Sequence, residues 1–391
     1  MSKDIKRINV TLKSEDSKTL SGWQLQEFIK NINKGYNKLD LTNEISRLIN
    51  EGKKPENIII INKSYDINNA YTYLQKSNEI DLNKSSMVEN LYHLGIPVSM
   101  YPNKRIKEIG VIFSLYRNIY TLFRSENIPV IEKDKLKEYI NLDIYKAISM
   151  INQESRYIMS KLKTANENIL KATSDKLDNI VSSAKVEISE YIADEYDMLN
   201  FKKIDNIELK KLKDTDKYLY TRIQSRYYSK FFELLNDIDR PIILLYEEQS
   251  NKLRVVKKEY MLNDIESENF LDFKDYSHNS PFVITIIAGV AISSIVALLY
   301  NASKEDEANT EKEKKNKKIE KEIDKNIKDV ILELANSTEL NQVNEVEDKF
   351  INNKLDDLKN GFNENIEKTL DRRGISNDIV ISIEEYKKSR Q

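Results

Sequence analysis

Residues 281–300 read PFVITIIAGVAISSIVALLY, and they decide the class of fold that the sequence predicts. The segment contains no charged side chain. A helix of about 20 residues, rising about 1.5 Å per residue, just crosses a hydrocarbon layer of about 30 Å. Ser280 can cap such a helix, Pro281 suits its first turn, and Tyr300 provides an interfacial anchor. The sequence therefore predicts one transmembrane helix at 280–301.

Two sets of side chains define the surface of this predicted helix. The membrane span comprises Phe282, Ile284, Ile286, Ile287, Val290, Ile292, Ile295, Leu298, Leu299 and Tyr300. Gly289, Ser293 and Ala297 recur every four residues, so this face would let a second helix approach closely. The spacing predicts self-association in the membrane, although small residues are also common in any apolar helix.

The sequence around the span gives conflicting indications of its orientation. Lysines cluster at 304–318 after the span, whereas Lys274 alone lies within the twenty residues before it. The positive-inside rule would place the C-terminal side in the cytoplasm. The long preceding region would then be exported, yet the N-terminus has no apolar stretch of signal-peptide length. A protein localised to the membrane with a single span of unresolved orientation is expected. The alternatives are a soluble protein that inserts 281–300 conditionally and a buried soluble helix.

The remainder of the chain favours long helices. Only 8 Gly and 6 Pro occur in 391 residues, so helix-breaking positions are sparse. From Leu142 to Leu199 neither residue occurs, and apolar side chains recur with a period of about 3.5 residues, as in coiled coils. A continuous helix there would be about 85 Å long. Apolar stripes at 319–334 and 343–370 predict further helices that either fold back on each other or join partner chains.

The N-terminal region combines strand and helix patterns. Residues 6–13 alternate like a strand, and residues 58–61 and 97–100 resemble short strands. Residues 25–32 and 41–49 have the spacing of two amphipathic helices, the second ending near Gly52. A small mixed α/β domain is therefore predicted before the long helices.

These patterns together predict a predominantly α-helical fold with four regions. The small N-terminal α/β domain occupies 1–130. A coiled-coil-like helical rod or bundle follows at 131–279 and ends in a β-hairpin at 241–256. The transmembrane helix at 280–301 precedes a charged amphipathic helical region at 302–391.

The residues that commonly carry chemistry do not form a recognisable motif. The chain has no cysteine, and His93 and His278 lack nearby ligands at metal-binding spacing. Gly52-Lys53-Lys54 lacks the upstream glycine and the following Ser or Thr of a phosphate-binding loop. The sequence therefore predicts no enzymatic activity, cofactor or metal site. A formal net charge of −2 makes nucleic acid an improbable partner.

One basic and aromatic cluster has two interpretations. It comprises Tyr218, Tyr220, Arg222, Arg226, Tyr227, Tyr228 and Lys230. These side chains could stack on bases or lie against lipid headgroups. Apolar residues share the same segment, however, so the favoured interpretation is a structural helix with Tyr227 in its buried stripe and the arginines paired to acids.

Three functional hypotheses follow from the sequence. The first is a single-pass, membrane-anchored, non-enzymatic scaffold or tether, with the lipid bilayer and protein partners or copies of itself as contacts. The second is a soluble helical protein that inserts 281–300 conditionally to form a pore. Its rod-like helices and single apolar segment resemble helical pore-forming toxins in general architecture, without a shared motif. The third is a sensor or enzyme of unfamiliar type with its site in the N-terminal domain.

Overall fold

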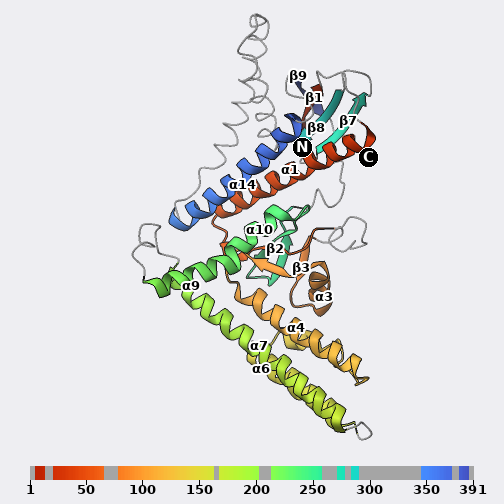
Figure 1. Ribbon diagram of the computed structural model, residues 1–391, viewed down its shortest axis with the longest axis vertical. Helices are drawn as coiled ribbons and strands as arrows, with labels where there is room; N and C mark the ends of the chain where they lie inside the picture. Colours follow the sequence, from red (N-terminus) through yellow and green to blue (C-terminus); the bar gives the residue numbers. More distant parts are fainter. Residues whose placement is uncertain are drawn as a thin grey trace, which may run out of the picture. The chain divides into compact units, whose positions relative to one another are not determined.

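The computed structural model shows a mostly helical protein with two antiparallel sheets (Figure 1). It describes residues 5–13, 21–65, 78–162, 167–201, 213–257, 271–277, 283–289, 345–371 and 378–386.

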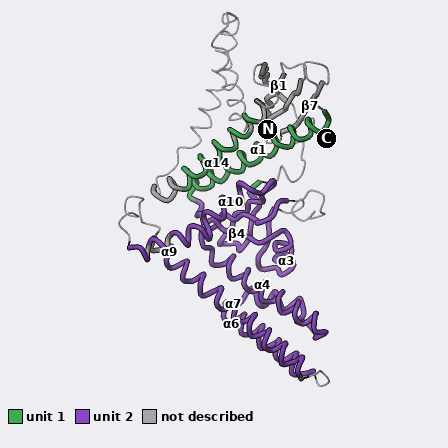
Figure 2. The backbone as a smooth tube through the Cα atoms, viewed as in Figure 1, with its two compact units in different colours: residues 1–52, 257–391 green, residues 53–256 purple. Residues whose placement is uncertain are grey.

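The chain divides into two compact units (Figure 2). Unit 1 combines residues 1–52 with 257–391, and unit 2 comprises residues 53–256. This division does not follow the order predicted from the sequence, because unit 2 extends across the expected boundary at residue 130. Both ends of the chain belong to unit 1.

A five-stranded antiparallel sheet forms part of the core of unit 2. Its strands are β2 (Ile58–Ile61), β3 (Glu79–Asp81), β4 (Pro97–Ser99), β5 (Ile243–Glu247) and β6 (Lys252–Val255), in the order β3-β6-β5-β2-β4. Ile59 of β2 pairs with Leu244 on one side and Ser99 on the other. All four isoleucines of β2 are buried. The strands predicted at 58–61 and 97–100 and the hairpin at 241–256 are confirmed, but the hairpin joins the same sheet as the earlier strands.

The loop that leads into β4 requires a glycine. Gly95 follows the short helix α3 (Ser85–Leu94) and has a φ of +153°. A Cβ atom at this position would lie 2.7 Å from Cγ2 of Ile61 and 2.8 Å from Oδ1 of Asn62. The same Asn62 oxygen accepts a hydrogen bond from the Ile96 N–H at 2.7 Å, so the neighbour cannot move freely.

The helices of unit 2 surround this sheet and extend beyond it. After the 3-10 turn η1 (Pro55–Asn57) and α3, they are α4 (Lys104–Ser125), α5 (Lys135–Ile140), α6 (Ile144–Ser160), α7 (Glu167–Phe201), α9 (Asp214–Gln224), the π-helical turn η2 (Ser225–Ser229) and α10 (Lys230–Asp237). The aromatic stripe of α4 is largely core, as Phe113, Tyr116 and Phe123 are buried.

The long helix predicted from Leu142 to Leu199 is instead two helices. Helix α6 ends at Ser160, α7 begins at Glu167, and the two lie side by side (Figure 1). Arg156 forms an ion pair with Asp178, which places them antiparallel. Folding back buries the apolar stripe of each helix against the other and against α4, whereas one extended helix would leave its stripe in water.

Unit 1 contains an antiparallel pair of long helices, α1 (Gly22–Asn50) and α14 (Glu345–Asp371). Lys38 lies over the ring of Phe362 at 5.6 Å, and Asn352 donates a hydrogen bond to Asn50 at 3.2 Å. The helix predicted at 343–370 is confirmed. The two helices predicted between 25 and 49 are one helix, because Gly35 does not interrupt it. The predicted stripe at 319–334, and hence the predicted helical hairpin, lies outside the described residues.

A four-stranded antiparallel sheet completes unit 1. Its strands are β1 (Ile5–Lys13), β7 (Leu271–Ser277), β8 (Val283–Gly289) and β9 (Asp378–Tyr386), in the order β7-β8-β1-β9. Val10 of β1 pairs with Ile286 of β8 and Ile381 of β9. The strand predicted at 6–13 is confirmed, and it lies at the centre of this sheet.

The predicted helix at 280–301 is therefore wrong over 283–289, where the chain is strand β8. Val283, Ile284, Thr285, Ile286 and Ile287 are all β-branched, which favours an extended backbone, and β1 and β7 supply hydrogen-bond partners on both edges. Across the described ranges, no helix combines the length and the apolar character needed to cross a bilayer.

The predicted span and packing face are placed only in part. Ile284, Ile286, Ile287 and Gly289 lie in β8. Gly289 therefore does not share a helical face with Ser293 and Ala297. The remaining predicted residues lie outside the described part of the chain: Phe282, Val290, Ile292, Ser293, Ile295, Ala297, Leu298, Leu299 and Tyr300.

The same substitution at two glycines is expected to have opposite effects. Gly95→Ala should lower the free energy of unfolding by roughly 1–3 kcal/mol, because it adds a clash at a positive φ. Gly361→Ala, within α14 and with open space around its Cα, should raise it by about 1 kcal/mol. Urea unfolding followed by circular dichroism measures both. A Gly95→Ala protein as stable as the wild type would contradict the described loop.

Candidate functional site

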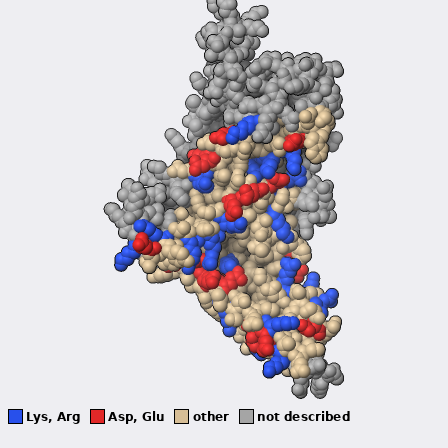
Figure 3. Space-filling view, viewed as in Figure 1, with Lys and Arg blue, Asp and Glu red and all other residues tan. Residues whose placement is uncertain are grey.

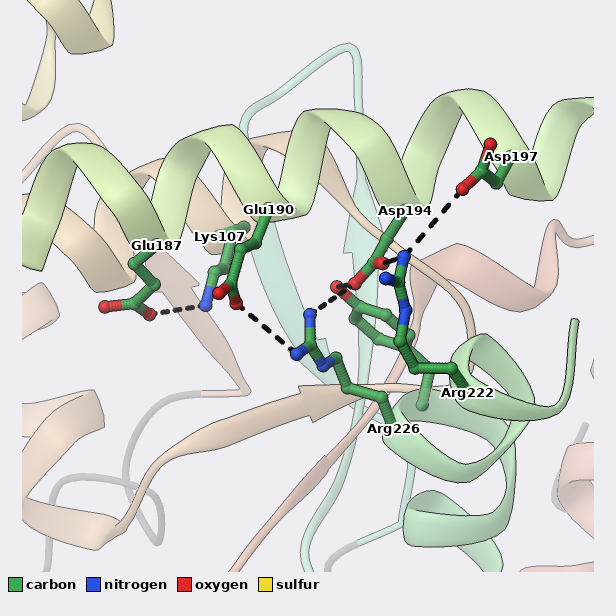
Figure 4. A network of polar contacts seen from close by, with 8 residues as sticks. Lys107, Glu187, Glu190, Asp194, Asp197, Arg222 and Arg226 are labelled. Carbon is green, nitrogen blue, oxygen red and sulfur yellow. Dashed lines mark hydrogen bonds and ion pairs between the residues drawn. The ribbon is translucent and has the colours of Figure 1, made fainter. Parts of the chain in front are cut away.

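A buried carboxylate lies at the junction of three helical elements of unit 2. Asp194 on α7 is only 1% exposed, and both of its oxygens are engaged (Figure 4). Arg222 of α9 contacts Oδ1 at 2.7 Å, and Arg226 of η2 contacts Oδ2 at 2.7 Å. The Tyr227 hydroxyl donates to Oδ2 at 3.2 Å. These contacts join α7 to the α9–η2 segment.

The π-helical turn accounts for this convergence. Arg222 and Arg226 are four residues apart and share a helix face, whereas Tyr227 would point elsewhere in a regular α-helix. Hydrogen bonding from residue i to i+5 in a π-turn places residues five apart on one side, so Tyr227 joins Arg222. The π-helical turn at 225–229 thus brings a third hydrogen-bond donor, the Tyr227 hydroxyl, to the carboxylate.

Further acids on α7 extend the network along the helix surface. Glu190 contacts Arg226 at 3.3 Å, and Asp197 contacts Arg222 at 3.8 Å. One turn earlier, Glu187 forms an ion pair with Lys107 of α4. Each positive group of this network therefore faces an acid of α7, and α4, α7 and the α9–η2 segment are held together by charge.

Two donors to Asp194 have raised pKa values. The hydrogen bond to Asp194 raises the pKa of Arg226 above its ordinary value. Burial, with the negative charge of Asp194 adding to it, raises the pKa of Tyr227 and keeps its hydroxyl protonated. Both oxygens of the buried Asp194 carboxylate already accept hydrogen bonds from the chain itself, so neither is open to an added substrate. The arrangement positions helices and does not present a reactive group.

A shallow groove runs beside this network on the exposed side of α7. It has a volume of about 480 Å³ and is lined by Asn179, Ser182, Ser183, Val186, Glu187 and Glu190. Positive and negative side chains are interspersed on the visible face of the described residues (Figure 3). The two glutamates of the groove already face Lys107 and Arg226, so the groove has little free charge to attract a ligand.

The structural interpretation of the cluster at 218–230 is confirmed for its arginines, but Tyr227 is only half-buried and the buried tyrosine of the segment is Tyr228. Arg222 and Arg226 pair with acids, and Tyr228 is buried and stacks with Tyr101 at 6.1 Å between ring centroids. Tyr218 is 69% exposed and does not belong to the network. Nothing in the sequence analysis singled out Asp194. It lies three residues after the buried Tyr191, and that position on the apolar repeat was the available signal.

The two histidines do not form a metal site in the described structure. His93 is exposed, and its Nδ1 lies 2.7 Å from the carbonyl oxygen of Glu89, while His278 lies outside the described residues. Within the described ranges, no three His, Asp or Glu side chains are grouped as metal ligands.

No protein family matches this sequence, and neither the curated proteins nor the solved structures compared with it are significantly similar.

Removing the central carboxylate is expected to destabilise unit 2. Asp194→Ala should lower the free energy of unfolding by about 3 kcal/mol, because it leaves two partly buried guanidinium groups without their main partner. Glu190→Ala, whose side chain is 56% exposed, should cost less than about 1 kcal/mol. Urea denaturation of the two variants and the wild type gives the comparison. Equal costs for the two substitutions would show that Asp194 is not a buried anchor.

Proposed function

We propose that this chain is a non-enzymatic scaffold that associates with other copies of itself through an exposed face of α7. The observation that carries the proposal is a pair of large apolar side chains one helical turn apart. Ile192 is 43% exposed and Tyr196 is 67% exposed. Residues four apart on a helix are neighbours, so the two form one continuous ridge.

The surroundings of this ridge suit a contact surface. Helix α7 packs on α4 and α6 and is tied to the α9–η2 segment by Asp194, so its backbone is held before any partner binds. A rigid surface loses little conformational entropy on association. Exposed aromatic side chains supply a large share of binding energy at protein interfaces. Rigidity and an aromatic ridge together support protein contacts through this helix.

Two negative charges on the ridge should abolish self-association. Sedimentation velocity of the wild type should show a concentration-dependent rise in mass, and Ile192→Glu/Tyr196→Glu should remain monomeric, because each charge would be desolvated at the contact. Asn179→Glu/Ser183→Glu adds the same charges on another flank of α7 and should associate like the wild type. A wild type that remains monomeric at every concentration would refute self-association.

A second candidate function is conditional insertion of residues 281–300 into a membrane. The observation that favours it is the position of β8, whose Thr285 pairs with Thr11 of β1 and with Asp275 of β7. A spanning helix needs its backbone hydrogen bonds within itself, so 283–289 would have to leave both neighbours before insertion. Pairing of β8 within the sheet would therefore prevent the apolar segment from inserting until the sheet opens.

A disulfide between β1 and β8 tests this candidate directly, because the chain has no cysteine of its own. Opposite residues in antiparallel strands lie about 4.5–5.5 Å apart between Cα atoms, within reach of a disulfide. Oxidised Thr11→Cys/Thr285→Cys should leave dye-filled liposomes intact, and its reduction should restore the leakage caused by the wild type.

A second disulfide, between β1 and β9, provides the control. Asn9 pairs with Ser382 of β9, so Asn9→Cys/Ser382→Cys joins β1 to β9 and leaves β8 free. Its oxidised form should release dye like the wild type. Leakage from the oxidised Thr11→Cys/Thr285→Cys protein, or intact liposomes with the wild type, would exclude insertion of this segment.

A further inference from the structure

Arg105, near the start of α4, is a half-buried arginine that forms no ion pair in the part of unit 2 that the structure describes. The described arginines that form ion pairs in this unit are Arg156, Arg222, Arg226 and Arg254. Arg105 instead donates from Nε to the amide oxygen Oδ1 of Asn251 at 3.1 Å. A neutral amide offsets the removal of a guanidinium from water less well than a carboxylate does.

The amide that holds Arg105 is itself fixed by its neighbours. The Tyr246 hydroxyl donates to the same Asn251 oxygen at 3.2 Å, and the Asn251 side-chain NH₂ donates to Oδ1 of Asn83 at 2.6 Å. Asn251 ends the turn between β5 and β6 with a φ of +52°, a backbone conformation that asparagine tolerates. Asn83 donates in turn to Asp81 at 3.1 Å. The position of the Arg105 Nε is thus determined by three segments.

The rest of the guanidinium remains available. Only its Nε–H forms a hydrogen bond within the described residues, so both terminal nitrogens retain N–H groups for an added acceptor. These hydrogen bonds occupy the amide oxygens of Asn83 and Asn251, so the free hydrogen-bonding groups at Arg105 are the N–H donors of its guanidinium. A group that binds here must therefore supply oxygen atoms and negative charge.

The electrostatics favour the same class of ligand. Burial lowers the pKa of Arg105, so its charged form gains from a nearby anion. Lys104, exposed on the preceding position, adds a second positive charge, and the first turn of a helix adds the positive end of its dipole. Glu108, one turn later, interacts electrostatically with Lys104 and Arg105 but forms no ion pair with either in the described structure; burial raises the pKa of its carboxyl. Two positive charges favour a dianion over a monoanion.

We propose that the terminal nitrogens of Arg105 bind a phosphate group of a small ligand beside the turn that joins β5 and β6. A guanidinium presents two parallel N–H groups to two phosphate oxygens, a geometry that an ammonium cannot match. The site lies where the turn after β3 meets the β5–β6 turn, and its residues come from positions 83, 105, 246 and 251. It is independent of the α7 ridge and of strand β8.

Inorganic phosphate is the probe for this site. The full chain should show a saturable rise in melting temperature with phosphate relative to chloride at equal ionic strength. Arg105→Gln should raise the Kd for phosphate at least about tenfold. Arg105→Lys should raise it several-fold, because lysine retains the positive charge but lacks the two parallel N–H groups of a guanidinium. Arg117→Gln removes an exposed arginine from the same helix and should bind like the wild type. No saturable shift, or equal shifts in wild type and Arg105→Gln, would overturn the proposal.

A measurement on the wild type covers the case in which Arg105→Gln does not fold. Phenylglyoxal modifies accessible arginines, and mass spectrometry reports each site separately. Phosphate should slow modification of Arg105 and leave the rate at Arg117 unchanged. Equal rates at Arg105 with phosphate and with chloride would overturn the proposal, whatever the behaviour of the variants.

Discussion

In both sheets an inner strand receives its backbone hydrogen-bond partners from other parts of the chain. Strand β1 lies between β8 and β9, and β2 lies between β4 and β5. An extended segment has N–H and C=O groups on two edges, and leaving either edge unpaired in a core would cost several kcal/mol. The need to pair both edges of β1 brings residues 5–13, 283–289 and 378–386 together, which explains why unit 1 contains both ends of the chain.

The same constraint separates what the sequence could predict from what it could not. The four isoleucines at 58–61 and the glycine at position 52 are local signals, and they predicted strand β2 and the end of helix α1. Residues 283–289 belong to an apolar run whose hydrophobicity suits a helix or a buried strand equally. Their β-branched composition favoured a strand, but the deciding factor was the presence of two neighbouring strands, β7 and the distant β1, that supply hydrogen-bond partners.

The sequence predicted the arginines of the charged network but not the acid that they contact. Arginines in an apolar helical segment indicated acidic partners, and Arg222 and Arg226 have them. The identity of the acid depended on two features without a clear sequence signal: the reversal between α6 and α7 and the π-turn at 225–229. Asp194 differs from the solvated acids around it because the apolar repeat of α7 carries it toward α9, and a carboxylate at such a position has to be matched by cations.

The buried Asp194 and the half-buried Arg105 illustrate two roles for a charge removed from water, one structural and one open to a ligand. Asp194 has two guanidinium groups and a hydroxyl within hydrogen-bond distance, so its charge is neutralised by the chain itself. Arg105 has one amide oxygen, which orients the guanidinium without neutralising it. Fixing a charged group in place before a ligand arrives reduces the entropy lost on binding, and leaving its charge unmatched preserves the energy that an anion can gain. The charge of Asp194 is already neutralised by the arginines that join α7 to the α9–η2 segment. The charge of Arg105, beside Asn251, is still able to interact with an added anion.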